Sequence, residues 1–350
     1  MKIFVAITNF NYGQYIGEAI ESVLNQTYPN FQLVIVDDGS TDDSRAVIDM
    51  YASEHTNKIT AIYKENGGQG SAFNVAYNLS EDFDIVTFLD ADDYWFPNKL
   101  EEIVLYHKEF DVVEHSLETS LKTCLLKQTK NNLSERLKRY RTAISFAPTS
   151  GLSYKKSVLD SIFPIPEHLT RICADTYINL VAVYNGANIC TLNQCLGFYR
   201  IHSDNNWFNN IEKYKSLYEE YIAFFNEKLK LINQPPIPTY EKAIYNGMKD
   251  VEYLLSVHNK IAVYGMGFFG KVVAKYLSEN QYEIVCFLQT YQDHQKESFF
   301  GKRIYGIHEI MNTKQMNDID TIVIATSFKY EVILLLEKLG IQKQIISFDI

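Results

Sequence analysis

Apolar residues in the first part of the chain fall into two kinds of pattern. Short, continuous and β-rich apolar runs predict buried strands at residues 3–7, 31–36, 59–63 and 85–89. Segments with apolar residues at helical spacing lie between them, at residues 16–25, 44–52 and 66–79. Strands that alternate with helices and are apolar throughout are typical of a mostly parallel sheet with helices on both faces. We therefore expect an α/β domain whose ligands bind at the carboxyl ends of the strands.

A proline-rich segment interrupts this pattern, which then resumes. Residues 214–231 are helical and rich in aromatic side chains, and residues 233–238 break the helix and predict an interdomain linker stiffened by proline. Further strands are expected at residues 260–264, 284–288 and 321–325, with a helix at 271–278. We expect an α/β domain over residues 1–210, a helical linker over 211–257 and a smaller α/β domain over 258–350.

The composition agrees with two folded domains and narrows the function. The chain has 350 residues, of which 46% are hydrophobic and 22% charged, enough to bury a sizeable core. Its net charge of -10 argues against a general nucleic-acid binder, because neutralising phosphates requires clustered positive charge. The sequence shows no signal peptide and no apolar stretch of about 18 residues. We interpret the protein as cytoplasmic.

The cysteines show neither a CxxC pair nor the spacing of zinc ligands. They are Cys124, Cys173, Cys190, Cys195 and Cys286. We expect free, mostly buried thiols, as in a reducing compartment.

Residues 118–141 are polar and basic, with leucines among the lysines and arginines. Such a segment is typical of the solvated face of a helix. The alternative is a basic amphipathic helix that contacts an anionic membrane, which would make the protein peripheral at the inner face of the membrane.

Short polar and acidic residues follow three of the predicted strands. They are Thr8 and Asn9, then Asp37 and Asp38, and then Asp90, Ala91, Asp92 and Asp93. In a parallel sheet these ends lie along one edge, so several carboxylates converge there. Such carboxylates repel one another unless a hard divalent cation binds them, and oxygen ligands favour Mg²⁺ or Mn²⁺. The alternative is that the aspartates only cap helices and turns, which accounts for one pair better than for the ordered set.

Three segments, in this order along the chain, resemble the family-two glycosyltransferases, whose catalytic domain has the GT-A fold. They are ITNFNYGQYIGEAIESVLNQTYPNFQLVIVDDGSTDDS, NGGQGSAFNVA and TFLDADD, the last of which contains a DxD motif. The resemblance covers residues 1–205. It implies an enzyme that uses a nucleotide-sugar donor together with Mn²⁺ or Mg²⁺.

The resemblance also implies a set of donor-binding and metal-binding residues. Thr8, Asn9 and Phe10 would line the nucleotide pocket, where Phe10 either stacks on the base or packs as an ordinary aromatic residue. Asp38 would accept a hydrogen bond from the base. The remaining donor-binding residues would be Gly68, Asn74, Asp90, Ala91, Ser150 and Gly151. The metal ligands would be Asp92, Asp90 and His202, although a lone histidine is also often structural.

Asp175 falls where the family carries a Glu-Asp pair at the start of a helix. This sequence has Ala174 in place of the first acid, but the aspartate is present. The resemblance implies that Asp175 is the catalytic base of an inverting transfer, since a carboxylate can take the proton of an attacking sugar hydroxyl. The alternative is that Asp175 only caps the helix.

The second domain carries a weaker signal for a nucleotide. Residues 265–270, GMGFFG, match GxGxxG between a predicted strand and a predicted helix. The next strand ends at Gln289 instead of the acid that would hold a ribose hydroxyl. The segment resembles the Rossmann-like domains found beside sugar-modifying enzymes, and we favour a degenerate or regulatory nucleotide fold over a working dehydrogenase.

Together these features predict an inverting, metal-assisted hexosyltransferase. It would move a sugar from a UDP-sugar to a glycan or lipid-linked acceptor in bacterial surface polysaccharide synthesis. One alternative is a nucleotide-sugar oxidoreductase that works through the second domain, and another is a non-catalytic module that binds a nucleotide sugar. The sequence does not encode the donor sugar, the acceptor or the linkage, because pocket shape decides them.

Overall fold

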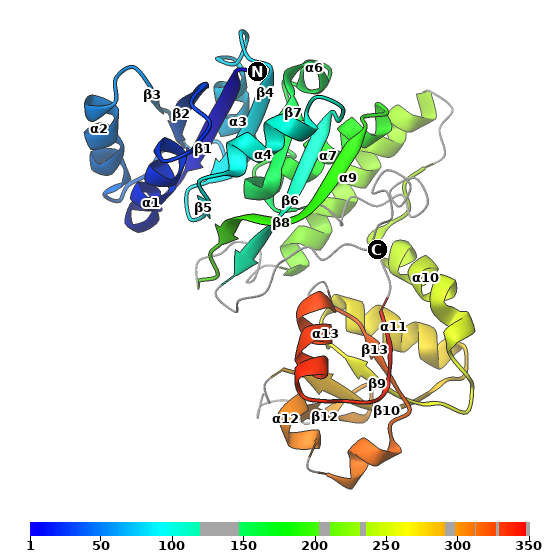
Figure 1. The fold of residues 1–350 in the computed structure, drawn as a ribbon. Coiled ribbons are helices and arrows are strands. Elements are labelled where there is room, and N and C mark those ends of the chain that lie inside the picture. Colours follow the sequence, from blue (N-terminus) through cyan, green and yellow to red (C-terminus); the bar gives the residue numbers. More distant parts are fainter. Residues whose placement is uncertain are drawn as a thin grey trace. The chain divides into compact units, whose positions relative to one another are not determined.

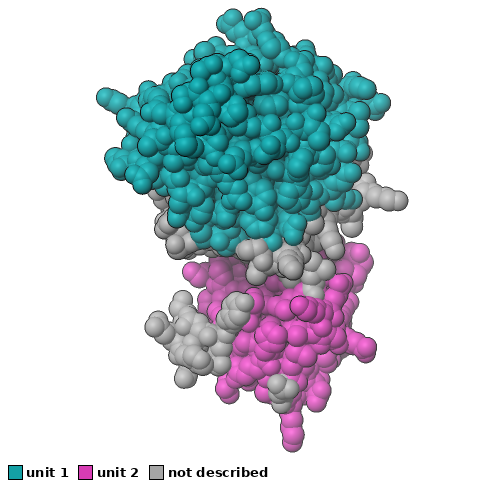
Figure 2. Space-filling model, turned by 60° about the vertical axis from the view of Figure 1, so that its left-hand side comes forward, with its two compact units in different colours: residues 1–139, 143–209 teal, residues 140–142, 210–350 magenta. Residues whose placement is uncertain are grey.

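The computed structural model describes residues 1–119, 147–202, 211–231, 236–290, 298–311, 313–326 and 329–347. These residues form two compact units, one within residues 1–209 and one within residues 210–350 (Figures 1 and 2). The basic segment 118–141 falls almost entirely outside the described ranges, so membrane contact stays a prediction. Within those ranges, every helix is too short or too polar to cross a bilayer.

The first unit begins with alternating strands and helices. Its elements are β1 (Ile3–Asn9), α1 (Gly13–Leu24), β2 (Phe31–Asp37), α2 (Ser44–Glu54), β3 (Ile59–Tyr63), α3 (Gln69–Tyr77), β4 (Ile85–Asp90), β5 (Tyr94–Trp95), α4 (Lys99–Tyr106), β6 (Val112–Thr119), η1 (Thr149–Gly151), β7 (Leu152–Lys155), α6 (Lys156–Leu159), α7 (Ala174–Tyr184) and β8 (Ile189–Tyr199). Helix α1 begins earlier than predicted because the Asp42 carboxylate accepts a hydrogen bond from the Gly13 N–H at 2.8 Å. The same carboxylate accepts the Ser44 N–H at the start of α2, so one side chain serves two helices.

Strands of the first unit form a mixed sheet in the order β3-β2-β1-β4-β7-β6-β8-β5. Strand β1 pairs in parallel with β2 and β4, and β2 pairs in parallel with β3. Strand β7 runs antiparallel to β4 and β6, and β5 runs antiparallel to β8. The predicted α/β fold is confirmed: its first four strands form a continuous parallel block, and β6 and β8 also pair in parallel. Beyond β4 the sheet is mixed, a change of direction that the apolar runs do not reveal.

Helices cover both faces of this sheet (Figure 1). One face packs against α1, α2 and α4 through a core that includes Ile3, Val5 and Ile20. On the other face Phe73 of α3 stacks on Phe88 of β4, with ring centroids 4.0 Å apart. Because both faces are covered, the strands are apolar at successive positions, as the sequence pattern predicted.

The second unit contains two leading helices and a smaller sheet. Its elements are α9 (Ile211–Leu231), α10 (Tyr240–Val251), η2 (Glu252–Leu254), β9 (Lys260–Tyr264), α11 (Phe268–Glu279), β10 (Glu283–Gln289), β11 (Ser298–Phe299), β12 (Lys302–Gly306), α12 (Ile307–Ile310), η3 (Lys314–Asp318), β13 (Thr321–Ile324), α13 (Lys329–Lys338) and β14 (Gln344–Ile346). Strands β12-β10-β9-β13-β14 are parallel neighbours in that order. This is the 3-2-1-4-5 order of a Rossmann-type sheet.

The glycines of the GMGFFG segment are explained by close packing. Gly265 has φ +114°, and a Cβ there would lie 2.4 Å from the Ala325 carbonyl oxygen. A Cβ on Gly270 would lie 2.2 Å from the Gly265 carbonyl oxygen. Both positions therefore require glycine for the strand-to-helix turn itself.

The cysteines differ in part from the prediction. Cys173, Cys190 and Cys286 are free thiols. Cys195 is disulfide-bonded, so the prediction of free thiols is wrong for this residue. Cysteine spacing along the chain does not reveal such a bond, because the bond requires only that two Cα atoms come close in the fold.

We expect Phe88→Ala to lower the free energy of unfolding of the first unit by about 3–5 kcal/mol, because it leaves a cavity beside Phe73. Both tryptophans, Trp95 and Trp207, belong to the first 209 residues, so urea denaturation followed by tryptophan fluorescence reports on this unit. Leu105→Ala is the matched control, since Leu105 is 52% exposed and its truncation should change stability by less than about 0.5 kcal/mol. Equal losses in the two variants would contradict the packing described for Phe88.

Candidate functional site

The carboxyl ends of β1, β2 and β4 lie side by side in the first sheet. Thr8 pairs with Asp90 across β1 and β4, and Asn9 pairs with Asp37 across β1 and β2. The Asn9 amide donates to Asp37 Oδ2 and Ser40 Oγ, both at 3.0 Å. The structure thus brings the polar strand ends together at one edge, where Asn9 ties the first two strands to each other.

Asp38, predicted to accept a hydrogen bond from a base, is already bonded within the chain. Its Oδ1 accepts from Lys64 Nζ at 2.6 Å and from the Gly67 N–H at 2.9 Å. Its Oδ2 accepts from the Gly68 N–H at 2.7 Å and from Asn66 Nδ2 at 3.2 Å. Asp38 thereby holds the loop of residues 64–68 against the end of β2, and Gly68 contributes a backbone donor to this bond set.

Two further predicted donor-binding residues lie in different environments. Phe10 follows β1 and is 44% exposed, which leaves an aromatic face open to solvent. Asn74 is buried on α3, where its Oδ1 accepts the Ile165 N–H and its Nδ2 donates to the Ile165 carbonyl, both at 2.9 Å. Asn74 also donates to Glu167, so it fastens residues 165–167 to α3. Donor contacts by Phe10 and Asn74 stay predictions.

Asp93 is the acid that anchors the loop after β4. Its Oδ2 accepts the Ser150 hydroxyl at 2.6 Å, and its Oδ1 accepts the Arg200 N–H at 2.9 Å. Burial and the neighbouring charges of Asp92 and Asp90 raise the pKa of Asp93 well above its ordinary value. Asp93 therefore joins the acidic loop to η1 and to the end of β8.

Asp90 and Asp92 lie in the same buried acidic cluster. Burial, and then the charges of Asp92 and Asp175, raise the pKa of Asp90 to about 8. Burial also raises the pKa of Asp92, although the hydrogen bond with His202 opposes that shift. The distance between His202 Nε2 and Asp92 Oδ2 is 3.0 Å, and the rings of Tyr12 and Tyr15 contact the imidazole. The three predicted metal ligands are thus connected through Asp92.

The cluster suits a divalent cation that takes part of its ligands from another molecule. Within the described ranges, the His, Cys, Asp and Glu side chains form no group of three that could hold a metal by themselves. Mg²⁺ beside nucleotides is usually held by one or two carboxylates, with phosphate oxygens and water completing the shell, and oxygen ligands suit Mn²⁺ as well. The raised pKa values of Asp90 and Asp92 reflect burial and repulsion that a cation would offset. The residues present therefore fit such an ion.

Asp175 is the second residue of α7 and is enclosed near the same cluster. Its carboxylate accepts a hydrogen bond from the Thr176 N–H at 2.8 Å, and Thr149 of η1 lies beside it. Burial raises the pKa of Asp175 to about 6, and the neighbouring Thr176 and Thr149 limit the rise. A carboxylate with this pKa is ionised at neutral pH and still basic enough to take a proton.

Three predicted donor-binding residues are packed inside the domain. Ser150 is fully buried, and its carbonyl accepts the Trp95 Nε1–H at 2.8 Å while its hydroxyl bonds to Asp93. A Cβ on Gly151 would lie 2.8 Å from the His115 carbonyl oxygen. The Ala91 side chain belongs to the hydrophobic core. These residues hold the acidic loop and η1 in place, and donor contacts by them stay predictions.

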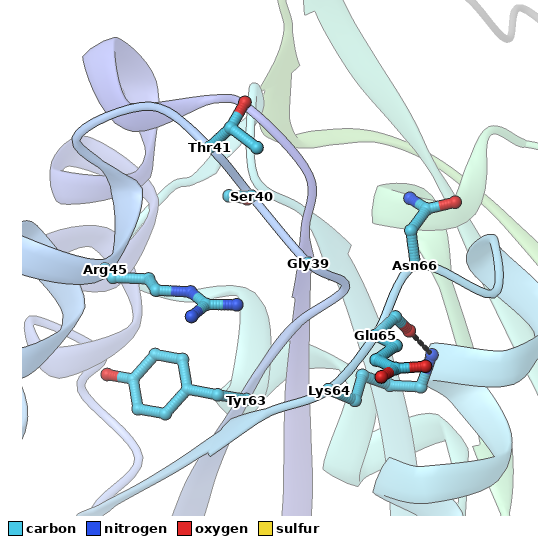
Figure 3. Close-up of a pocket in the computed structure, with 8 residues that line it drawn as sticks. All are labelled: Gly39, Ser40, Thr41, Arg45, Tyr63, Lys64, Glu65 and Asn66. Atoms are coloured by element: carbon cyan, nitrogen blue, oxygen red, sulfur yellow. Dashed lines mark hydrogen bonds between the residues drawn. The ribbon is translucent and has the colours of Figure 1, made fainter.

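A pocket of about 500 Å³ lies beside the residues that surround Asp38 (Figure 3). It is lined by Gly39, Ser40, Thr41, Arg45, Tyr63, Lys64, Glu65 and Asn66. Figure 3 shows the guanidinium of Arg45 beside the ring of Tyr63, and its carbon lies 5.4 Å from the ring centroid. The pocket therefore combines an aromatic face with cationic groups.

Several residues that connect the site do not stand out in the sequence. Gln69 donates to Asp90, Thr149 lies beside Asp175, and Arg200 donates through its Nε–H to the Asp92 carbonyl at 2.9 Å. Arg200 also forms an ion pair with Glu18. Each was visible beside an assigned residue, since Gln69 follows Gly68, Thr149 precedes Ser150 and Arg200 lies two residues before His202.

Two family descriptions match this chain. "Glycosyl transferase family 2" matches residues 4–163, which include the loop after β4 and the strands β1–β7 apart from Ile3. "C2185-like, N-terminal" matches residues 257–347 of the second unit.

Relatives with sequence similarity carry glycosyltransferase names. An uncharacterized glycosyltransferase of Nostoc sp. is 43% identical over 216 residues, which cover 59% of this chain and 66% of the relative. Glycosyltransferase GlyG of Streptococcus pneumoniae is 33% identical over 114 residues, which cover 32% of this chain and 37% of GlyG. The chain thus spans less than two thirds of the length of these relatives.

A solved structure shares part of the fold of this chain. Residues 1–349 of S. aureus TarS, in complex with UDP-GlcNAc, match with a TM-score of 0.52 and 22% identity over 64% of this chain and 66% of that one. The same protein in complex with UDP matches with a TM-score of 0.51 over 73% of each chain. The likeness is one of fold.

We expect Ser150→Ala to lower the free energy of unfolding by about 1–3 kcal/mol, because it removes a donor from the buried Asp93 carboxyl group and the acceptor of the Asp90 N–H. Urea denaturation measures the loss. Ser161→Ala is the control, since its exposed hydroxyl bonds to the Val158 carbonyl and its removal should change stability by less than about 0.5 kcal/mol. A Ser150→Ala protein as stable as the wild type would show that the Asp93 contact contributes nothing.

Proposed function

This chain belongs to glycosyl transferase family 2 through the domain that spans residues 4–163, and we propose that it transfers a sugar from a UDP-sugar to an acceptor hydroxyl with inversion. The observation that carries the proposal is the half-buried Asp175 at the start of α7, whose carboxyl pKa is raised to about 6 and which lies beside the acidic cluster of Asp90 and Asp92. We further propose a glycan or lipid-linked acceptor in bacterial surface polysaccharide synthesis, at the cytoplasmic side of the membrane. The proposed catalytic domain is residues 1–210, followed by a helical linker and a Rossmann-like domain.

Asp175 acts as the general base in this proposal. The acceptor oxygen attacks the anomeric carbon, its proton moves to the Asp175 carboxylate, and the bond from the anomeric carbon to the phosphate oxygen breaks. The nucleoside diphosphate leaves with the electron pair of that bond. Because the attack and the departure occur on opposite faces of the sugar, one displacement inverts the anomeric centre. The hydrogen bond from the Thr176 N–H holds the carboxylate in orientation.

Asp92 and Asp90, with His202, hold the proposed Mn²⁺ or Mg²⁺. When bound, such an ion stabilises negative charge on the departing diphosphate. Arg200 keeps the Asp92 loop in place through its bond to the Asp92 carbonyl and its ion pair with Glu18. The protein residues therefore present the carboxylates as a rigid set.

We propose that the nucleobase of the donor binds near Phe10 and Asp38. Phe10 supplies an exposed aromatic face, and the pocket of Figure 3 lies beside Asp38 with Arg45 and Tyr63 in its wall. The choice of UDP follows S. aureus TarS, which shares the fold and is in complex with UDP-GlcNAc. Asp38 can accept a hydrogen bond from the nucleobase when one of its hydrogen bonds from the loop of residues 64–68 breaks.

We expect Asp175→Asn to lower kcat for sugar transfer by about 10²–10⁴-fold, the usual contribution of a general base. The base must be ionised, so the wild-type kcat should fall as the pH drops through about 6, the raised pKa of Asp175, and level off above it. Steady-state assays of UDP release between pH 5 and 9 measure both effects. Asp82→Asn, at an exposed position, is the control and should match the wild type. An Asp175→Asn enzyme with more than a tenth of the wild-type kcat would contradict the base assignment.

We also expect UDP to raise the melting temperature of the purified protein only when Mn²⁺ is present, because a ligand that binds the folded state stabilises it. Asp92→Ala should abolish this shift. Differential scanning fluorimetry across nucleoside diphosphates and dinucleotides makes the measurement. A shift with NAD or NADP and none with UDP would move the function to the second unit and reject the proposed donor site.

A further inference from the structure

Gln69, the first residue of α3, lies between the acidic cluster and the helix that carries Asp175. We propose that Gln69 is a positioning residue: one amide group fixes the donor side and the base side of the site relative to each other. The proposal rests on the function proposed above, because it gives Gln69 a role in orienting Asp175. It assigns no contact between Gln69 and the substrate.

The nitrogen and the oxygen of the Gln69 side-chain amide form hydrogen bonds with different parts of the site. Its Nε2 donates to Asp90 Oδ1 at 3.2 Å and lies 3.4 Å from Thr149 Oγ1. Its Oε1 accepts the Ala174 N–H at 2.9 Å. Ala174 is the first residue of α7 and immediately precedes Asp175. A single side chain therefore connects the strand end of β4, η1 and the start of α7.

The bond to Ala174 supplies what the start of α7 lacks. The first N–H groups of a helix have no partner inside the helix and are commonly satisfied by a side chain at the N-cap. The N-cap here is Cys173, whose backbone is left-handed with φ +55° and whose side chain forms no cap bond within the described ranges. Gln69, from a different helix, satisfies the Ala174 N–H instead. The orientation of α7 at Asp175 thus depends on α3.

Backbone contacts leave Gln69 little freedom to move. The Gln69 N–H donates to the Arg171 carbonyl at 2.9 Å, and the Gly70 N–H donates to the Thr170 carbonyl at 2.7 Å. A Cβ on Gly68 would lie 2.7 Å from Arg171 Cα, and one on Gly70 would lie 1.8 Å from Thr170 Oγ1. The two glycines permit this close approach of the α3 start to residues 170–171, and the approach carries the Gln69 side chain to Ala174.

An amide suits this place for a chemical reason. Asp90 needs a donor, and the Ala174 N–H needs an acceptor, and glutamine provides both without adding charge. Glutamate would keep an acceptor for Ala174 but would face Asp90 with a second carboxylate. Methionine has similar length and shape but provides neither bond. These two substitutions separate the bond to α7 from the bond to Asp90.

Gln69→Met should lower kcat by about 10–100-fold, since a misplacement of about 1 Å at a reacting group reduces rates by about that factor. Its KM for the donor should stay within about threefold of the wild type, because Asp90 and Asp92 remain in place. Gln69→Glu should restore kcat to within about fivefold of the wild type, because the acceptor for Ala174 is retained, while its KM for the donor rises by about tenfold. Steady-state kinetics with a UDP-sugar and Mn²⁺ provide these values.

Gln26→Met is the matched control. Gln26 is another buried glutamine that accepts a helix N–H, from Leu100 at 2.9 Å, and donates to the carbonyls of Ser22 and Phe96. Its bonds lie in a part of the domain that holds none of the catalytic acids. If Gln69 were merely structural, Gln69→Met and Gln26→Met would both lose stability. The two variants would then also show the same pattern of change in kcat relative to KM.

Hydrogen exchange tests the anchoring independently of activity. The Ala174 amide should exchange at least about tenfold faster in Gln69→Met than in the wild type, and at the wild-type rate in Gln69→Glu and Gln26→Met. Wild-type exchange in Gln69→Met, or a Gln69→Glu enzyme with the low kcat of Gln69→Met, would overturn the proposal. A wild-type protein that transfers no sugar would reject the proposed function, whereas the exchange of the Ala174 amide would still decide whether Gln69 holds α7.

Discussion

Confinement of several carboxylates in one buried place is the constraint on which the rest of the first unit depends. Asp90, Asp92, Asp93 and Asp175 lie in or beside the same enclosed region, and burial raises the pKa of each. Such an arrangement is unfavourable by itself, because ionised groups lose their hydration and repel one another. Neighbouring polar groups offset this cost through hydrogen bonds to the acids. They are Gln69, Ser150, Arg200 and His202.

The change of strand direction beyond β4 makes this arrangement possible. Strand β7 runs antiparallel to β4, so the residues that enter β7 lie near the place where β4 ends. Those residues form η1, in which Ser150 bonds to Asp93 and Thr149 lies beside Asp175. The parallel part of the sheet supplies the acids, and the antiparallel strand supplies the groups that hold them. A fully parallel sheet would place the start of the neighbouring strand at the opposite edge.

Much of the fold and part of the site follow from the sequence. The apolar runs locate the first four strands, and their polar ends identify the edge at which Thr8, Asn9 and Asp90 meet. The pattern does not predict where each side chain bonds. Gln69 and Ala174 are 105 residues apart, and Asn74 and Ile165 are 91 apart, so no local periodicity relates them. The sequence pattern does not predict the disulfide at Cys195 for the same reason.

The bonds of Asp38 have a consequence for the thermodynamics of recognition. Within the described residues its carboxylate already has four donors, from Lys64, Asn66, Gly67 and Gly68. A ligand group that bonds to Asp38 therefore exchanges one hydrogen bond for another, and the net gain is the difference between two similar bonds, about 1 kcal/mol or less. The enthalpy of that contact should be small, and selectivity among ligands should come from shape and from the ordering of the loop of residues 64–68. A ligand group that bonds to Asp38 would therefore compete with donors that the protein itself already supplies.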